Sequence, residues 1–150
     1  MIITIDANIL VALLNDKAFA YGFKQFCHLY KVEETLIPAP AMCEFLAHDY
    51  AERFSFFQKF KRQARVISFD EKAAYLTAQL GERYNKNKLD IGKQKVKVDL
   101  QILGIALANH SLFILTKDGD FNKYIERLKL KIGIKTVADL YIKDDLFGES

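Results

Sequence analysis

Several features of common protein classes are missing from this chain of 150 residues. No apolar run approaches the roughly 20 residues that a transmembrane helix needs. The start of the chain has no basic segment of the kind that opens a secretory signal peptide, and Asp6 interrupts its first apolar stretch. We therefore expect a cytoplasmic protein without a membrane segment.

Cysteine and histidine are also scarce. Cys27 and Cys43 stand among apolar residues and form no CxxC pair, so we expect two buried, reduced thiols. The three histidines, His28, His48 and His110, are scattered, and no Ser/His/Asp set for nucleophilic catalysis is apparent. A glycine-rich phosphate loop is absent as well.

The composition that remains is that of a folded protein. Hydrophobic residues make up 51% and charged residues 27% of the chain, which excludes a disordered protein. The length predicts one domain, residues 1–150, large enough to have a substantial core. The net charge of +3 is too small to indicate a nucleic-acid binder by itself.

Short apolar segments alternate with helical patterns along the chain. Strands are predicted at residues 2–5, 36–38, 66–69, 112–116 and 132–135. Helices are predicted from residue 8, with Asn8 as the cap, and at residues 18–30, 41–50, 51–64, 71–84, 99–109 and 121–128, with a last turn from residue 136. The lysine-rich residues 85–98 are expected to form an exposed connection. This order predicts an α/β fold, a three-layer α/β/α sandwich around a mostly parallel sheet.

Acidic residues recur close to the ends of the predicted strands. They are Asp6, Glu44, Asp99, Asp118 and Asp120. In parallel α/β sheets, ligands bind outside the carboxyl ends of the strands, so we expect these acids to meet at one edge. Clustered carboxylates repel one another unless a cation joins them, and oxygen ligands suit Mg²⁺ or Mn²⁺. Such a site is typical of phosphodiester hydrolysis.

Each acid also has a simpler interpretation. Asp6 could be a turn or cap residue, Glu44 could face solvent, and Asp99 could only cap its helix. Asp118 and Asp120 could form a polar turn with the glycine between them.

The motifs that carry these acids resemble, in order and spacing, those of the PIN domain family, and within it the VapC-type toxins of prokaryotic toxin–antitoxin pairs. They are IDAN from residue 5, MCEF from residue 42, VDLQI from residue 98 and LTKDGDF from residue 115. The resemblance spans essentially the whole chain. It implies a PIN-like fold and a metal-dependent endoribonuclease that cuts single-stranded RNA with Mg²⁺ or Mn²⁺. It also implies a homodimer that a small antitoxin protein silences.

The resemblance also assigns roles by position. Asp6, Glu44 and Asp99 would be metal ligands, Asp118 or Asp120 would supply the fourth acid, and the other would support it. Asn8 and Thr116 would hydrogen-bond to these ligands. Two alternatives stay open for the function: a PIN nuclease of RNA processing that is not a toxin, and a catalytically weak RNA-binding or scaffold domain.

Two other classes with acids at strand ends fit less well. A receiver domain of two-component signalling needs paired acids at the first strand, and these are missing. A haloacid-dehalogenase-like phosphatase needs a second aspartate two residues after Asp6, where Asn8 stands.

The predicted connection before Asp99 is strongly basic. Its lysines are Lys86, Lys88, Lys93, Lys95 and Lys97. We expect them to hold an RNA backbone beside the metal site, with a solvated loop as the alternative. The four phenylalanines of the predicted helix 51–64 favour core packing, or a groove for a dimer partner or antitoxin, over base stacking. They are Phe54, Phe56, Phe57 and Phe60.

Overall fold

The computed structural model of the chain describes residues 1–135. Its strands are β1 (Ile2–Ile5), β2 (Glu34–Pro38), β3 (Arg65–Ile67), β4 (Phe113–Leu115) and β5 (Gly133–Lys135). Its helices are α1 (Ala7–Asn15), α2 (Lys17–Leu29), α3 (Ala39–Leu46), α4 (Tyr50–Phe60), α5 (Glu71–Asn85), α6 (Lys93–Ala108) and α7 (Asp120–Leu128), with a 3₁₀ turn at Lys61–Gln63. The last turn that the sequence predicts from residue 136 lies outside the described residues.

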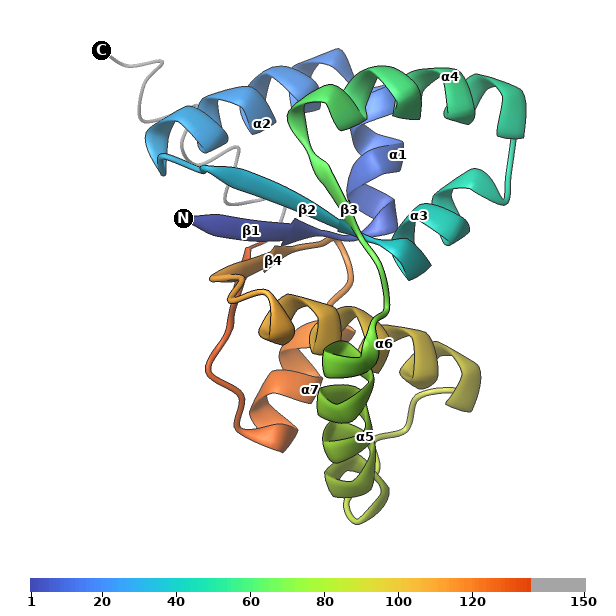
Figure 1. Cartoon of the computed structure of the whole chain (residues 1–150), viewed down its shortest axis with the longest axis vertical. Helices are drawn as coiled ribbons and strands as arrows, with labels where there is room; N and C mark the ends of the chain where they lie inside the picture. Colours follow the sequence, from blue (N-terminus) through green and yellow to red (C-terminus); the bar gives the residue numbers. More distant parts are fainter. Residues whose placement is uncertain (136–150) are drawn as a thin grey trace.

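All five strands pair in parallel, in the order β3-β2-β1-β4-β5. Figure 1 shows α1, α2 and α4 over one face of this sheet and α5, α6 and α7 over the other. The predicted α/β/α sandwich is therefore confirmed. The chain proceeds outward from β1 through β2 to β3 and then returns to place β4 on the other side of β1. The loops that follow β1 and β4 consequently diverge at this point, where parallel sheets commonly bind ligands.

The centre of the sheet is fully buried. Ile3 and Ile5 of β1 and Leu36 and Ile37 of β2 have no exposed surface. Helix α6 packs closely on α5 at Gly104, where a Cβ atom would collide with the hydroxyl of Thr77 and would lie 3.0 Å from a backbone oxygen of α5. This close approach helps to hold α6 in one position on the sheet.

Two predicted helix starts are wrong. Asp6, not Asn8, caps α1, because its carboxylate accepts the backbone N–H of Ala7 at 2.8 Å. Helix α6 begins at Lys93, so half of the predicted exposed connection is helical and Asp99 lies in the second turn instead of at the start. Val96, which is 6% exposed, anchors this additional turn in the core.

The other boundaries differ by a few residues. Helix α3 begins at Ala39, two residues before the predicted start, with Pro40 in its first turn, where the missing N–H costs nothing. Asp70 caps α5 as predicted and accepts the N–H of Ala73 at 2.9 Å. Both cysteines are free thiols in the described part of the chain, but Cys27 is only half-buried and Cys43 is exposed, contrary to the expectation of burial. Between residues 1 and 135, no helix has the length and apolar character needed to cross a bilayer.

Candidate metal centre

A cavity of about 800 Å³ opens where the carboxyl ends of β1 and β4 meet the helices α3 and α6. We call it the acidic cavity, after the four carboxylates that line it: Asp6, Glu44, Asp99 and Asp118. Asn8 and Lys95 line it as well. The structure thus brings four of the five predicted acids to one cavity, and the fifth, Asp120, lies beside them.

Asp6 is held by a network that joins β1 to β4. Besides the N–H of Ala7, its carboxylate accepts the hydroxyl of Thr116 at 3.0 Å and the amide of Asn8 at 3.3 Å. The same hydroxyl oxygen of Thr116 accepts the backbone N–H of Asp118 at 3.0 Å. Both side chains that the resemblance places around the acids therefore contact Asp6 directly.

Burial makes the ionised form of Asp6 costly. Its side chain has little contact with water, and this burial raises its pKa from 3.8 to about 6, although its hydrogen bonds act in the opposite direction. The negative charges of Glu44 and Asp99 raise the pKa of Asp6 further. A cation bound beside Asp6 would relieve this cost.

Asp99 projects from α6 and is 6% exposed. Its Oδ2 atom accepts the buried hydroxyl of Tyr124 at 2.7 Å and the ammonium of Lys95 at the same distance. Burial raises the pKa of Asp99, while these two hydrogen bonds oppose the rise. Burial next to Asp99 also raises the pKa of Tyr124, so this residue stays a hydroxyl donor.

Asp118 and Asp120 follow β4 in a tight turn, in which the backbone N–H of Asp120 donates to Asp118 Oδ1 at 2.9 Å. Asp99, Asp118 and Asp120 each present one oxygen atom within 4.8 Å of the others. We call these three residues the acid triad. Carboxylate oxygens are the donors that hard divalent cations prefer, so this set fits a metal ion such as Mg²⁺ or Mn²⁺.

Lys95 lies against the acid triad and contacts all three of its members. Its Nζ atom is 2.7 Å from Asp99 and 2.9 Å from Asp120, and it also forms an ion pair with Asp118. Burial alone would lower the pKa of Lys95, but the hydrogen bonds to the three carboxylates raise it above its ordinary value. The bond from Lys95 is the main reason that the pKa of Asp120 is lowered.

Glu44 reaches the cavity from the second turn of α3. It is exposed, which is the simpler interpretation of the sequence, yet it lines the same cavity as the buried acids. Glu44 is thus exposed to solvent and still close enough to the buried acids for its negative charge to raise the pKa of Asp6.

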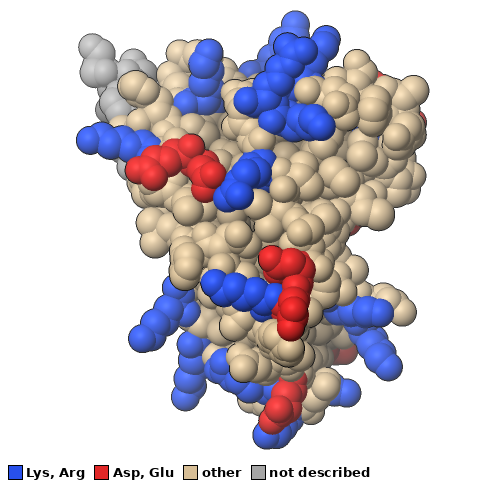
Figure 2. Space-filling view, in the orientation of Figure 1, with Lys and Arg blue, Asp and Glu red and all other residues tan. Residues whose placement is uncertain are grey.

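Three of the other four predicted lysines line a second cavity. This cavity, the α5–α6 groove, measures about 860 Å³ and is lined by Lys88, Lys93 and Lys97. It shares Phe69, Gln94 and Gln101 with the acidic cavity, so the two cavities adjoin. Lys86 pairs with Glu82 on the exposed surface instead. Figure 2 shows basic side chains projecting from both helical layers, with acidic side chains in small groups between them.

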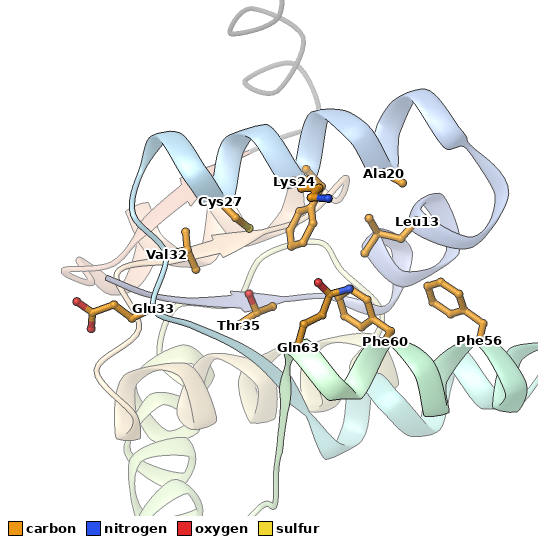
Figure 3. Close-up of a pocket in the computed structure, with 11 residues that line it drawn as sticks. Leu13, Ala20, Lys24, Cys27, Val32, Glu33, Thr35, Phe56, Phe60 and Gln63 are labelled. Carbon is orange, nitrogen blue, oxygen red and sulfur yellow. The ribbon is translucent and has the colours of Figure 1, made fainter.

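A third cavity, the α2–α4 groove, lies on the opposite side of the sheet (Figure 3). It measures about 460 Å³, and its apolar wall includes Leu13, Phe56 and Phe60. Of the four phenylalanines considered in the sequence, Phe57 and Phe60 are buried, whereas Phe54 is 40% exposed. Core packing and a groove thus both account for this aromatic segment.

Tyr124 and the position of Lys95 were missed at the level of sequence. Tyr124 belongs to the amphipathic pattern of α7 and resembles an ordinary core residue, so no signal pointed to the site. Lys95 precedes Asp99 by four residues, a spacing that places both on one face of a helix. This spacing has meaning only within a helix, and residues 85–98 were expected to form an exposed connection.

Comparisons with known proteins agree with this geometry. A family model described as the PIN domain matches residues 3–126. No curated protein sequence matches the chain.

Several solved structures share the fold. The structure of VapBC2 from Rickettsia felis, bound to a DNA fragment from its promoter, is 19% identical with a TM-score of 0.71 and covers 91% of this chain and 98% of that one. VapBC-1 from nontypeable Haemophilus influenzae is 16% identical with a TM-score of 0.66, covering 92% and 99%. VapC20 from Mycobacterium tuberculosis, a toxin that cleaves the sarcin-ricin loop, is 16% identical with a TM-score of 0.57, covering 81% and 93%.

Proposed function

The chain belongs to the PIN domain family, and from this premise we propose that it is a metal-dependent endoribonuclease that hydrolyses phosphodiester bonds in single-stranded RNA. The observation that carries the proposal is the meeting of Asp6, Glu44, Asp99 and Asp118 in one cavity. Burial raises the pKa of Asp6, and the charges of Glu44 and Asp99 raise it further, so a cation in this cavity would stabilise the ionised carboxylate.

The proposed ligands of Mg²⁺ or Mn²⁺ are Asp6, Glu44, Asp99 and one of Asp118 and Asp120, with the other in support. A bound divalent ion would lower the pKa of a water molecule and neutralise charge on the phosphate. The remaining chemistry concerns positioning. Thr116 and Asn8 orient the carboxylate of Asp6, and Tyr124 orients that of Asp99.

We assign the RNA path to the α5–α6 groove, because it adjoins the acidic cavity and shares lining residues with it. Lys88, Lys93 and Lys97 line this groove and would pair with phosphates, which gives affinity without sequence choice. Lys86 would add charge at the surface nearby. Lys95 has a different position from the other four, because its ammonium already pairs with carboxylates.

The proposal is tested by cleavage of a labelled single-stranded RNA by the purified protein. We expect cleavage with Mg²⁺ or Mn²⁺ and none in EDTA. Asp6→Asn and Asp99→Asn should abolish it. Asp49→Asn is the matched control, because Asp49 is exposed and its side chain makes no capping bond. Equal cleavage by the wild type and both site variants, or full activity in EDTA, would contradict the proposal.

We further propose that the protein is the toxin of a toxin–antitoxin pair. Structures of VapBC complexes from Rickettsia felis and Haemophilus influenzae share its fold, which supports a small antitoxin protein as the partner. The α2–α4 groove, with its wall of Phe56 and Phe60, offers an apolar surface for such a partner (Figure 3). The functional unit would be a homodimer.

Expression in cells tests the toxin assignment. Production of the wild type should arrest growth, whereas production of Asp99→Asn at the same level should not. We expect a short open reading frame beside the gene, whose coexpression should restore growth and whose product should copurify with the chain. Harmless expression of an enzyme that is active in the RNA assay would contradict the assignment. Light scattering of the purified protein tests the homodimer.

A further inference from the structure

Lys95 is the residue of the site whose chemistry the proposed function leaves unexplained. An RNA-binding lysine should reach outward to phosphates, but the ammonium of Lys95 pairs with three carboxylates. It contacts Asp99 at 2.7 Å and Asp120 at 2.9 Å and also pairs with Asp118. Those are the three members of the acid triad, whose oxygen atoms lie within 4.8 Å of one another. The ammonium therefore contacts every carboxylate of the acid triad, although not Asp6 or Glu44.

The position of Lys95 follows from the architecture of α6. Lys95 precedes Asp99 by four residues on the same helix, so their side chains share one face. Asp99 is fixed from the other side by the hydroxyl of Tyr124 at 2.7 Å. The turn after β4 then brings Asp118 and Asp120 to the same ammonium, and Lys123 holds Asp120 at 3.2 Å from outside. Three separate contacts thus select one position for the charge.

The Lys95 side chain is nevertheless able to leave. It is 44% exposed, whereas that of Asp99 is 9% exposed. A lysine side chain is a flexible four-carbon stem, so the ammonium can turn to solvent without any movement of the helix backbone. The side chains of Asp118 and Asp120 are also less exposed than that of Lys95, at 23% and 20%.

We propose that Lys95 is a built-in cation of the acid triad, which takes the place of a divalent ion in the metal-free protein and competes with such an ion for the three carboxylates. This inference rests on the proposed function, because it concerns the same metal site. In the metal-free protein, Lys95 offsets the repulsion among the acids. Metal binding then requires the ammonium to leave, which weakens the apparent affinity for the ion.

Direct titration with Mn²⁺ tests the proposal, with free Mn²⁺ followed by electron paramagnetic resonance. We expect Lys95→Met to bind Mn²⁺ about tenfold more tightly than the wild type, since one competing charge is removed. Lys95→Arg keeps the charge and should stay near the wild type. Lys97→Met is the matched control, because it removes an exposed positive charge two residues further along α6 that pairs with no described carboxylate. Its Mn²⁺ affinity should be unchanged.

Thermal melting in EDTA gives a second readout. Lys95→Met should melt about 5 °C below Lys97→Met, because the acid triad loses its cation, and Mn²⁺ should remove this difference. Lys95→Gln, which keeps a hydrogen-bond donor without charge, replaces Lys95→Met in both assays if the latter does not fold.

The possible results distinguish the role of Lys95 from the existence of the metal site. Equal Mn²⁺ affinity of the wild type, Lys95→Met and Lys95→Gln would overturn the role of Lys95 and leave the metal site intact. Lower stability in EDTA with unchanged Mn²⁺ affinity would also overturn it, since Lys95 would then be only a structural ion pair. No binding of Mn²⁺ to any of these proteins would overturn both this role and the metal site of the proposed function.

Discussion

Replacing Asp6 with asparagine should stabilise the metal-free protein at neutral pH relative to the wild type, while it removes the proposed activity. The physical reason is the burial that raises the pKa of Asp6 from 3.8 to about 6. Each pKa unit corresponds to about 1.4 kcal/mol, so the ionised carboxylate costs the folded state about 3 kcal/mol when no cation is bound. Asparagine carries no charge and escapes this cost.

The pH dependence gives the direction of the effect. Below pH 4, Asp6 is protonated in both the folded and the unfolded chain, and its ionisation contributes nothing. Between pH 4 and 6, the unfolded chain releases the proton while the folded chain keeps it, so the free energy of unfolding of the wild type falls as pH rises. Above pH 6 both states are ionised, and the full cost is present. Asp6→Asn lacks this dependence.

Urea unfolding of both proteins in EDTA at several pH values from 4 to 8 measures the effect. The lost bond from Thr116 costs Asp6→Asn about 1 kcal/mol at every pH, so the net gain at pH 7 should be about 2 kcal/mol. The difference between the two proteins should change by about 3 kcal/mol over this pH range. Saturating Mg²⁺ should stabilise the wild type more than Asp6→Asn, which keeps the acid triad but lacks the Asp6 carboxylate. A difference that does not vary with pH would refute the reasoning.

Three further substitutions probe the support of the site and of the fold. Tyr124→Phe removes the hydroxyl that Asp99 accepts and should lower the free energy of unfolding by about 2 kcal/mol, with slower RNA cleavage in the same preparation. Thr116→Val removes the side-chain hydrogen bonds that join Asp6 to the turn after β4 and should cost about 2 kcal/mol in urea unfolding. Gly104→Ala should lower the melting temperature by several degrees, and Thr77→Ala in the same chain should recover part of the loss. Unchanged melting of Gly104→Ala would contradict the close packing of α5 and α6.

The fold could be predicted from the sequence because the patterns that indicate its strands and helices are local. Short apolar strands such as Ile2–Ile5 and the amphipathic helices between them predict a parallel α/β sheet without reference to distant contacts. The meeting of the acids could be predicted for the same reason. Each acid follows the end of a strand or lies on a helix next to a strand. The general rule for parallel sheets then places them at one edge.

The start of α6 was not accessible in this way. Lysines in the first turn of a helix are unfavourable because of the helix dipole, so Lys93 and Lys95 favour the interpretation as a loop. Tertiary contacts override this preference, since Val96 enters the core and Lys95 pairs with Asp99. The role of Tyr124 was hidden for a different reason, because the acid that it contacts lies 25 residues away.

The acids of the acidic cavity come from early and late parts of the chain, and this order affects when the site can form during synthesis. Asp6 and Glu44 leave the ribosome early, whereas Asp118 leaves late, and the bond between Asp6 and Thr116 joins residues 110 positions apart. A nascent chain therefore holds only part of the site until β4 and the turn after it have emerged. With the ribonuclease activity proposed above, a chain assembled in this order would not cut the message from which it is being translated before the turn after β4 has folded against β1.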